Sequence, residues 1–67
     1  MNELRNLKKG TLFTKNEIAY PNESQVWIKG DYVRSMKRFE CYRYYDAKVE
    51  YMLPDKIVYT DMTFKGV

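Results

Sequence analysis

The sequence predicts a small, mainly β domain, a five-stranded antiparallel coiled sheet that closes into an SH3-like barrel. The first observation behind this prediction is the stretch Gln25–Asp46, which reads as two aromatic-rich strands joined by a short polar turn. The second is a set of short strand patterns around it, and the third is a long loop-like connection before it. An OB-like barrel and an open sheet that dimerises are the alternatives. We expect one domain over residues 1–67, with a lead-in turn at 1–10 and a tail at 65–67.

The lead-in is polar apart from Leu4 and Leu7, whose spacing lets both touch the core from one helical turn. Gly10 ends this turn, because glycine accepts the backbone conformation that follows a helix. The first strand pattern is Thr11–Lys15. Residues 16–24 contain a cluster of turn-forming residues, so a long loop is expected before the second strand.

The central hairpin is predicted from its alternation, since successive side chains of a strand point to opposite faces. One face of the first arm carries Val26, Ile28, Gly30 and Tyr32, and the other carries Trp27, Lys29, Asp31 and Val33. The polar loop Arg34–Lys37 joins the arms. The resulting register pairs Val33 with Arg38, Tyr32 with Phe39, Gly30 with Cys41 and Val26 with Tyr45. It turns Ile28 and Phe39 inward and the Trp27 indole outward.

A competing turn signal lies at Lys29-Gly30-Asp31. We reject it because the strand before it would be too short and the strand-like Tyr32-Val33 would fall in a loop. Gly30 is instead predicted to mark a bulge or a bend, as glycines inside strand patterns often do.

Two more strand patterns follow the hairpin. Val49–Leu53 alternates in polarity, and Pro54 ends it because proline cannot donate to a sheet ladder. Ile57–Phe64 alternates regularly and is predicted as the final strand. No internal repeat or linker suggests a second domain.

The cysteine content and the charge of the chain limit the classes of function that are expected. The chain has one cysteine and no histidine, so neither an internal disulfide nor a zinc site is expected. A reducing compartment, the cytoplasm, fits this composition, and no segment has the ~20 apolar residues that span a bilayer. The net charge of +3 comes from interleaved signs, and it favours nucleic-acid binding only if the cations gather on one face.

Three segments resemble a recurrent pattern in short bacterial proteins of unknown function that are carried on mobile elements and phages. They are LKKGTLF (7–13), QVWIKGDYVRSMKRFECY (25–42) and DKIVYTDMTF (55–64). The resemblance implies a small β domain and no particular chemistry. The sequence departs from the pattern at Pro54, where a glycine is expected, and at Val33, where an aspartate is expected. Both departures concern loop geometry.

Catalysis is not expected from this sequence. The thiol of Cys41 lies in mid-strand with no sequence neighbour that would lower its pKa. Carboxylate pairs are available, Asp55 with Asp61 and Asp31 with Glu40, but no catalytic signature flanks them. Cross-strand contacts are expected to occupy the hairpin carboxylates as Lys29–Glu40 and Asp31–Arg38 pairs. We therefore predict a protein that is not an enzyme and that uses no cofactor or metal.

An aromatic and cationic face of the hairpin is the candidate binding site. Its members are Trp27, Lys29, Arg38, Tyr42, Arg43 and Tyr44. Such a face can bind an extended peptide, pack against another copy, or stack unpaired bases while its cations meet phosphates. Packing of the aromatic rings inside a small coiled sheet is the competing explanation.

The predicted function is that of a small interaction module that binds a protein partner, or another copy of itself, through this face. The resemblance adds an association with a mobile element or phage. A nucleic-acid-binding accessory protein is the alternative, and no membrane partner is expected.

Overall fold

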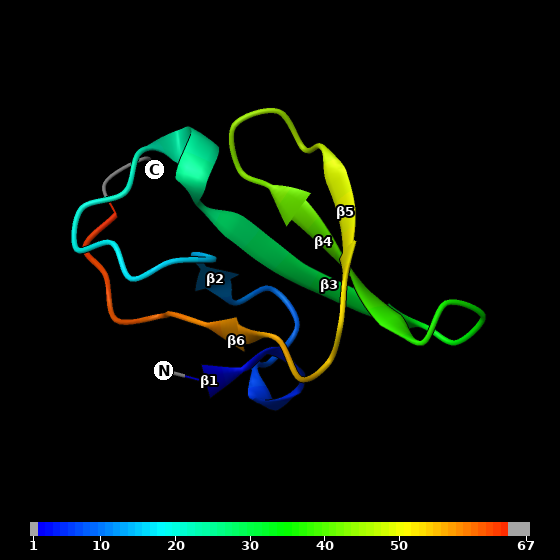
Figure 1. The fold of residues 1–67 in the computed structure, drawn as a ribbon. Coiled ribbons are helices and arrows are strands. Elements are labelled where there is room, and N and C mark those ends of the chain that lie inside the picture. Colours follow the sequence, from blue (N-terminus) through cyan, green and yellow to red (C-terminus); the bar gives the residue numbers. More distant parts are fainter. Residues whose placement is uncertain (1, 65–67) are drawn as a thin grey trace.

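Short strands and tight turns build this chain into two antiparallel sheets (Figure 1). The structure is a computed structural model that describes residues 2–64. Its strands are β1 (Asn2–Glu3), β2 (Leu12–Phe13), β3 (Trp27–Val33), β4 (Arg38–Arg43), β5 (Val49–Met52) and β6 (Ile57–Val58). Its helical segments are single 3₁₀ turns, η1 (Leu4–Asn6) and η2 (Glu23–Gln25). The expected tail at 65–67 lies outside the described residues.

The larger sheet has four strands in the order β2-β3-β4-β5, and β1 pairs with β6 in a second, two-stranded sheet. A bridge links the sheets, because the Thr14 amide donates to the Tyr59 carbonyl at 2.9 Å and the Tyr59 amide donates back at 3.0 Å. The prediction of a mainly β, antiparallel domain is confirmed. The expected closure into a barrel is not observed, since β6 pairs with β1 and, within the described residues, β5 pairs only with β4.

The two ends of the described chain differ from the prediction. The lead-in contains an unpredicted strand, β1, although Leu4 is buried in the core and Leu7 packs against it as their spacing predicts. The final strand is shorter than predicted, because β6 ends at Val58. Residues 60–64 run instead beside the 16–24 loop, where the Thr63 amide donates to the Ala19 carbonyl at 2.9 Å.

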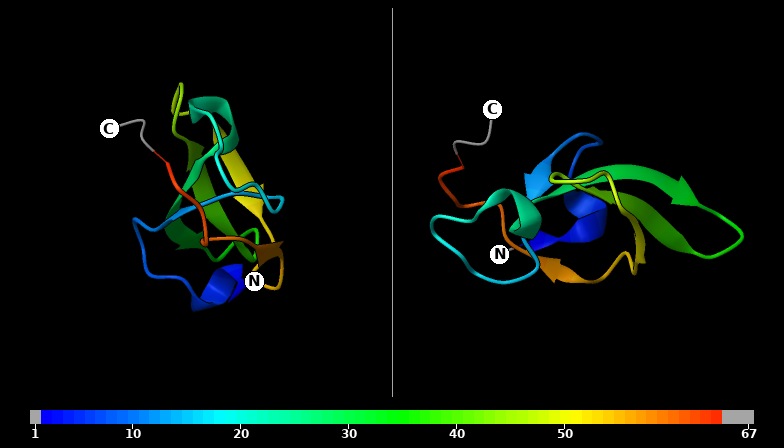
Figure 2. Two further views of the ribbon diagram at one scale, coloured as in Figure 1. Left: turned by 90° about the vertical axis from the view of Figure 1, so that its left-hand side faces the viewer. Right: turned by 90° about the horizontal axis from the view of Figure 1, so that it is seen from above.

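The hairpin of β3 and β4 projects beyond the rest of the molecule (Figure 2). Its strand pairing contains a bulge. Near the turn the register is as predicted, with Val33 opposite Arg38 and Tyr32 opposite Phe39. Past the bulge, which lies between Lys29 and Tyr32, the pairing shifts by one residue. The observed pairs there are Lys29 with Cys41 and Trp27 with Arg43, so the predicted pairs of Gly30 with Cys41 and Val26 with Tyr45 are wrong.

This shift decides which residues form the core, because moving a strand by one residue turns its side chains to the opposite face. Trp27, predicted to face outward, is buried with 6% of its surface exposed, while Ile28, predicted to face inward, lies on the other face. We call the face that carries Trp27 the inner face and the opposite one the outer face. The buried core consists of Leu4, Phe13, Trp27, Cys41, Met52 and Val58, with Phe39 packed against it as predicted.

Gly30 lies at the bulge because a larger residue does not fit there. A Cβ atom at this position would lie 2.5 Å from the carbonyl oxygen of Glu40 and 2.8 Å from the Cε2 atom of Tyr42. The carbonyl belongs to the neighbouring strand and cannot move independently of it. The absence of a side chain therefore lets Tyr42 lie close over β3, and the predicted bulge at this glycine is confirmed.

Candidate interaction surface

The predicted binding face loses two of its members to the interior. Trp27 and Lys29 each expose 6% of their surface. The Nζ atom of Lys29 donates a hydrogen bond to the carbonyl oxygen of Leu7 and lies 4.1 Å from the centre of the Phe39 ring. Burial lowers the pKa of this ammonium group, because desolvation disfavours the charged form. Lys29 is therefore a packed core residue, and the predicted Lys29–Glu40 contact is not formed.

The remaining four predicted residues do not form one platform either. Arg43 lies opposite Trp27 and donates to both carboxylate oxygens of Asp46, at 2.9 Å and 2.6 Å. Tyr42 lies on the outer face, half-buried, and its hydroxyl donates to Glu40. Tyr44 follows the end of β4 and makes an edge-to-face contact with Phe64, with ring centres 4.9 Å apart. The expectation that Trp27 shares a face with the two tyrosines is wrong because of the bulge.

The ionisable groups of these pairs respond to their partners. The hydrogen bond from Arg43 lowers the pKa of Asp46 to about 2, and the same contact raises the pKa of Arg43. The acceptor Glu40 raises the pKa of Tyr42 to about 12, since ionising the phenol would end the hydrogen bond and place two negative charges together. Arg38 is exposed. Asp31, expected to contact Arg38, lies 2.9 Å from the Lys9 Nζ atom instead.

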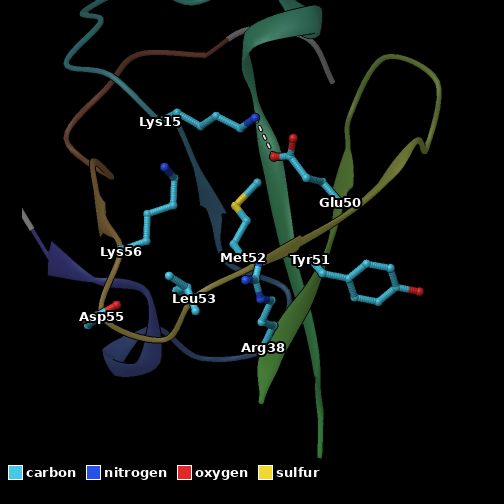
Figure 3. Close-up of a pocket in the computed structure, with 8 residues that line it drawn as sticks. All are labelled: Lys15, Arg38, Glu50, Tyr51, Met52, Leu53, Asp55 and Lys56. Carbon is cyan, nitrogen blue, oxygen red and sulfur yellow. Dashed lines mark ion pairs between the residues drawn. The ribbon is translucent and has the colours of Figure 1, made fainter. Parts of the chain in front are cut away.

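Lys15, which the sequence did not single out, holds the inner face together. Its Nζ atom lies 4.4 Å from the centre of the Trp27 ring and 2.5 Å from a carboxylate oxygen of Glu50 on β5 (Figure 3). The contact spans the sheet from the segment after β2 to its far strand. The lysine covers the indole and closes the interior at this point, and only the three-dimensional fold brings the three residues together.

The structure exposes a different surface, the free edge of β5. Within the described residues, β5 has β4 as its sole strand partner. The Arg43 amide donates to the Lys48 carbonyl at 2.9 Å, and hydrogen bonding alternates along an antiparallel pair. The backbone groups of Glu50 and Met52 therefore face β4. Those of Val49 and Tyr51 face away from it, as does the amide of Leu53, whereas the Leu53 carbonyl accepts a hydrogen bond from the Lys56 amide at 3.1 Å.

Apolar side chains accompany this unpaired backbone. Val49, Tyr51 and Leu53 expose 42%, 40% and 49% of their surfaces. Natural edge strands are commonly protected by charged residues, proline or a bulge. In β5 the charged Glu50 points to the inner face, where it pairs with Lys15, and Lys48 and Pro54 flank the strand at its ends. We call Val49, Tyr51 and Leu53, with their outward backbone groups, the β5 edge.

A row of partly exposed apolar side chains continues from the β5 edge across the outer face. The row takes one residue from each strand of the larger sheet, namely Val49, Tyr42, Ile28 and Leu12. Because these residues lie side by side in register, they form a continuous apolar band beside the free backbone. We call this row the outer row.

A groove lies on the opposite side of β5, along its inner face (Figure 3). Its volume is about 440 Å³, and its lining residues are Lys15, Arg38, Glu50, Tyr51, Met52, Leu53, Asp55 and Lys56. The Tyr51 ring points away from the groove, while Met52 and Leu53 lie at its centre (Figure 3). A chain segment docked on the β5 edge would therefore have apolar contacts on both faces.

The described residues hold no metal cluster and no membrane-spanning helix beside this surface. No group of three or more His, Cys, Asp or Glu side chains that could hold a metal ion occurs among residues 2–64. In the same part of the chain, no helix is long and apolar enough to cross a membrane. Comparisons with protein families, with curated proteins and with solved structures find no match to this chain. The resemblance to mobile-element proteins therefore stays a prediction.

Proposed function

We propose that this chain is a non-catalytic interaction module that binds a protein partner by adding an extended segment to the β5 edge. The observation that carries the proposal is the coincidence of outward backbone groups with exposed apolar side chains at Val49 and Tyr51, followed by the outward amide and exposed side chain of Leu53. In strand addition, main-chain hydrogen bonds supply affinity and alternate side chains supply specificity. Both components are present along this one strand.

The surroundings of β5 support the same conclusion. The outer row extends the apolar contact area on one face of the added strand, and the groove offers Met52 and Leu53 on the other. Arg38, Lys56 and Asp55 border the groove and would orient charged groups of the bound segment. This arrangement matches the apolar centre and polar rim of protein interfaces.

Nucleic-acid binding receives less support. The proposed stacking platform required Trp27 beside Tyr42, with Lys29 and Arg43 free to meet phosphates. Trp27 and Lys29 are buried instead, and Arg43 is paired with Asp46. Unpaired bases need exposed ring faces next to accessible cations, so we prefer a protein partner.

The setting of the module remains part of the proposal. A single cysteine favours a reducing compartment, so we place the module in the cytoplasm. The resemblance to proteins of mobile elements and phages would put its partner among the proteins of the host cell.

Site-specific photo-crosslinking in the organism that encodes the chain tests this function. A benzophenone amino acid replaces Tyr51 on the β5 edge, and the matched control carries it at Met36, which is also exposed but lies in the hairpin turn. We expect a discrete protein adduct at position 51, either with another protein or with a second copy, and none at position 36. Equal labelling at both positions, or no adduct at either, would refute the proposal.

A further inference from the structure

We infer that the occupant of the β5 edge is the β5 edge of a second copy of this chain, paired antiparallel about a two-fold axis at Tyr51. This inference rests on the proposed function, since it names the partner of the same surface.

The backbone register is self-complementary. Val49 and Tyr51 turn both N–H and C=O away from β4, and Leu53 turns its N–H away while its C=O accepts from the Lys56 amide at 3.1 Å. A two-fold axis at Tyr51 sets this residue opposite the partner's Tyr51, and it sets Val49 opposite the partner's Leu53. Every outward residue then meets an outward residue, which is the condition for an antiparallel hydrogen-bonded pair. The two larger sheets become one continuous sheet.

The side chains match in the same register. Val49, Tyr51 and Leu53 are all apolar and 40–49% exposed. On pairing, two tyrosines meet at the axis on the outer face, and Val49 comes opposite the partner's Leu53, whose side chain lines the groove. Aromatic and branched apolar pairs are favourable cross-strand neighbours. The outer rows of the two copies would end about 14 Å apart across the axis, with the two tyrosines between them.

Charge selects this register over its neighbours. With the axis at Tyr51, Glu50 lies opposite the partner's Met52, and Lys48 comes beside the partner's Pro54, within reach of the partner's Asp55. Lys48 and Asp55 take part in none of the ion pairs found among the described residues. An axis at Glu50 would set two carboxylates opposite each other, which is unfavourable. An axis at Met52 would set Val49 opposite the partner's Asp55, an apolar side chain against a charged one.

The size of the contact sets the expected strength. β5 is a strand of four residues, so pairing at this edge buries less area than the ~1,600 Å² of a standard interface. We therefore expect a reversible dimer with a dissociation constant in the micromolar range. The ion pair between Lys48 and the partner's Asp55 should make the dimer weaker in high salt, because salt screens exposed ion pairs.

Disulfide trapping in the purified full chain tests the dimer and its register together. Tyr51→Cys places two thiols opposite each other at the axis, where the Cα separation of about 5.5 Å allows a disulfide. Ser35→Cys, at the exposed hairpin turn, is the matched control. The native Cys41 is fully buried and should not interfere. We expect Tyr51→Cys to form a covalent dimer at least ten times faster than Ser35→Cys.

A mixture of two further variants checks the register. Val49→Cys and Leu53→Cys should crosslink to each other faster than either crosslinks to itself, since like positions lie about 14 Å apart across the axis. Sedimentation equilibrium of the unmodified chain should show a dimer, and Tyr51→Lys should weaken it at least 100-fold because two ammonium groups would meet at the axis. Circular dichroism confirms that each variant is folded.

The dimer is overturned if the unmodified chain stays monomeric at millimolar concentration, or if Tyr51→Cys crosslinks no faster than Ser35→Cys. Photo-adducts of position 51 with a different protein would then leave the proposed function standing with another occupant. Loss of both the dimer and the photo-adduct would remove both proposals.

Discussion

The Nζ atom of Lys15 lies 2.5 Å from a carboxylate oxygen of Glu50, so an ion pair joins the segment after β2 to the edge strand β5. The same ammonium group covers the Trp27 ring at 4.4 Å. One lysine thus steadies the interior and the strand that carries the candidate surface, and its removal should affect both.

Lys15→Met should lower the free energy of unfolding by about 1 kcal/mol. The ion pair is partly exposed and is worth ~0.2–1 kcal/mol, and the cation–π contact adds roughly 0.5–1 kcal/mol, offset in part by the apolar replacement. Urea unfolding measures the change. Glu50→Gln, which removes the ion pair but keeps the contact with Trp27, should cost less. Equal costs for the two variants would show that the indole contact contributes nothing.

Gly30→Ala should destabilise the chain by about 2–3 kcal/mol. The added Cβ would lie 2.5 Å from the Glu40 carbonyl oxygen, and relieving that overlap requires β3 and β4 to separate at the bulge. Chemical denaturation gives the magnitude, and amide chemical shifts should change around Glu40 and Tyr42. A loss below ~0.5 kcal/mol would mean that the bulge relaxes without disturbing the hairpin.

The buried thiol of Cys41 should make the fold sensitive to alkaline pH. Burial raises the pKa of this thiol from 9.0 to about 11. A group with a raised folded-state pKa stabilises the fold below its unfolded pKa, and this contribution is lost as the pH rises from about 9 to 11. The loss should reach the order of 2 kcal/mol.

Urea unfolding at several pH values measures the effect of Cys41, and Cys41→Ala is the control. The alanine variant should be less stable at neutral pH because it leaves a small cavity, but it should lack the thiol's part of the alkaline decline. If the stability of Cys41→Ala falls with rising pH as steeply as that of the native chain, the decline comes from groups other than Cys41.

Asp46 should make the fold sensitive to acidic pH, because its pKa is lowered and not raised. Its pKa is lowered to about 2 by Arg43, so its stabilising effect is present above pH 4 and is lost as the pH falls toward 2. The urea midpoint of the native chain should fall over this range. Asp46→Asn should show a shallower fall, because it cannot form the ion pair at any pH. An unchanged pH profile would show that the pair adds no stability.

The parts of the fold that the sequence predicted correctly have local causes. The polar loop between two aromatic arms defines the hairpin turn, and the pairs next to it, Val33 with Arg38 and Tyr32 with Phe39, follow from counting residues outward. The spacing of Leu4 and Leu7 placed both against the core in the same way. In each case the deciding residues are neighbours in sequence.

The predicted binding face failed at one residue. Gly30 was predicted to mark a bulge or a bend, but the predicted register ran through it without the shift that a bulge causes. The face assignments of Trp27 and Ile28 were therefore reversed, although their alternation was correctly recognised. When both faces of a strand carry large apolar residues, the alternation alone does not determine which face is buried.

The β5 edge could not be identified from the sequence because it depends on long-range pairing. The alternation of Val49, Tyr51 and Leu53 was visible, but closure into a barrel would have covered the strand. Only the pairing of β6 with β1 leaves β5 with a free side. The contact of Lys15 with Glu50 is hidden for the same reason, since the two residues come from opposite ends of the sheet.

The pairing of β1 with β6 also has a consequence for biosynthesis. The ribosome makes Asn2 and Glu3 early, yet their partners Ile57 and Val58 are added only near the end of the described chain. The first strand must therefore wait unpaired while the central hairpin, whose contacts are local, can already form. The fold can therefore be completed only after β6 has left the exit tunnel of the ribosome.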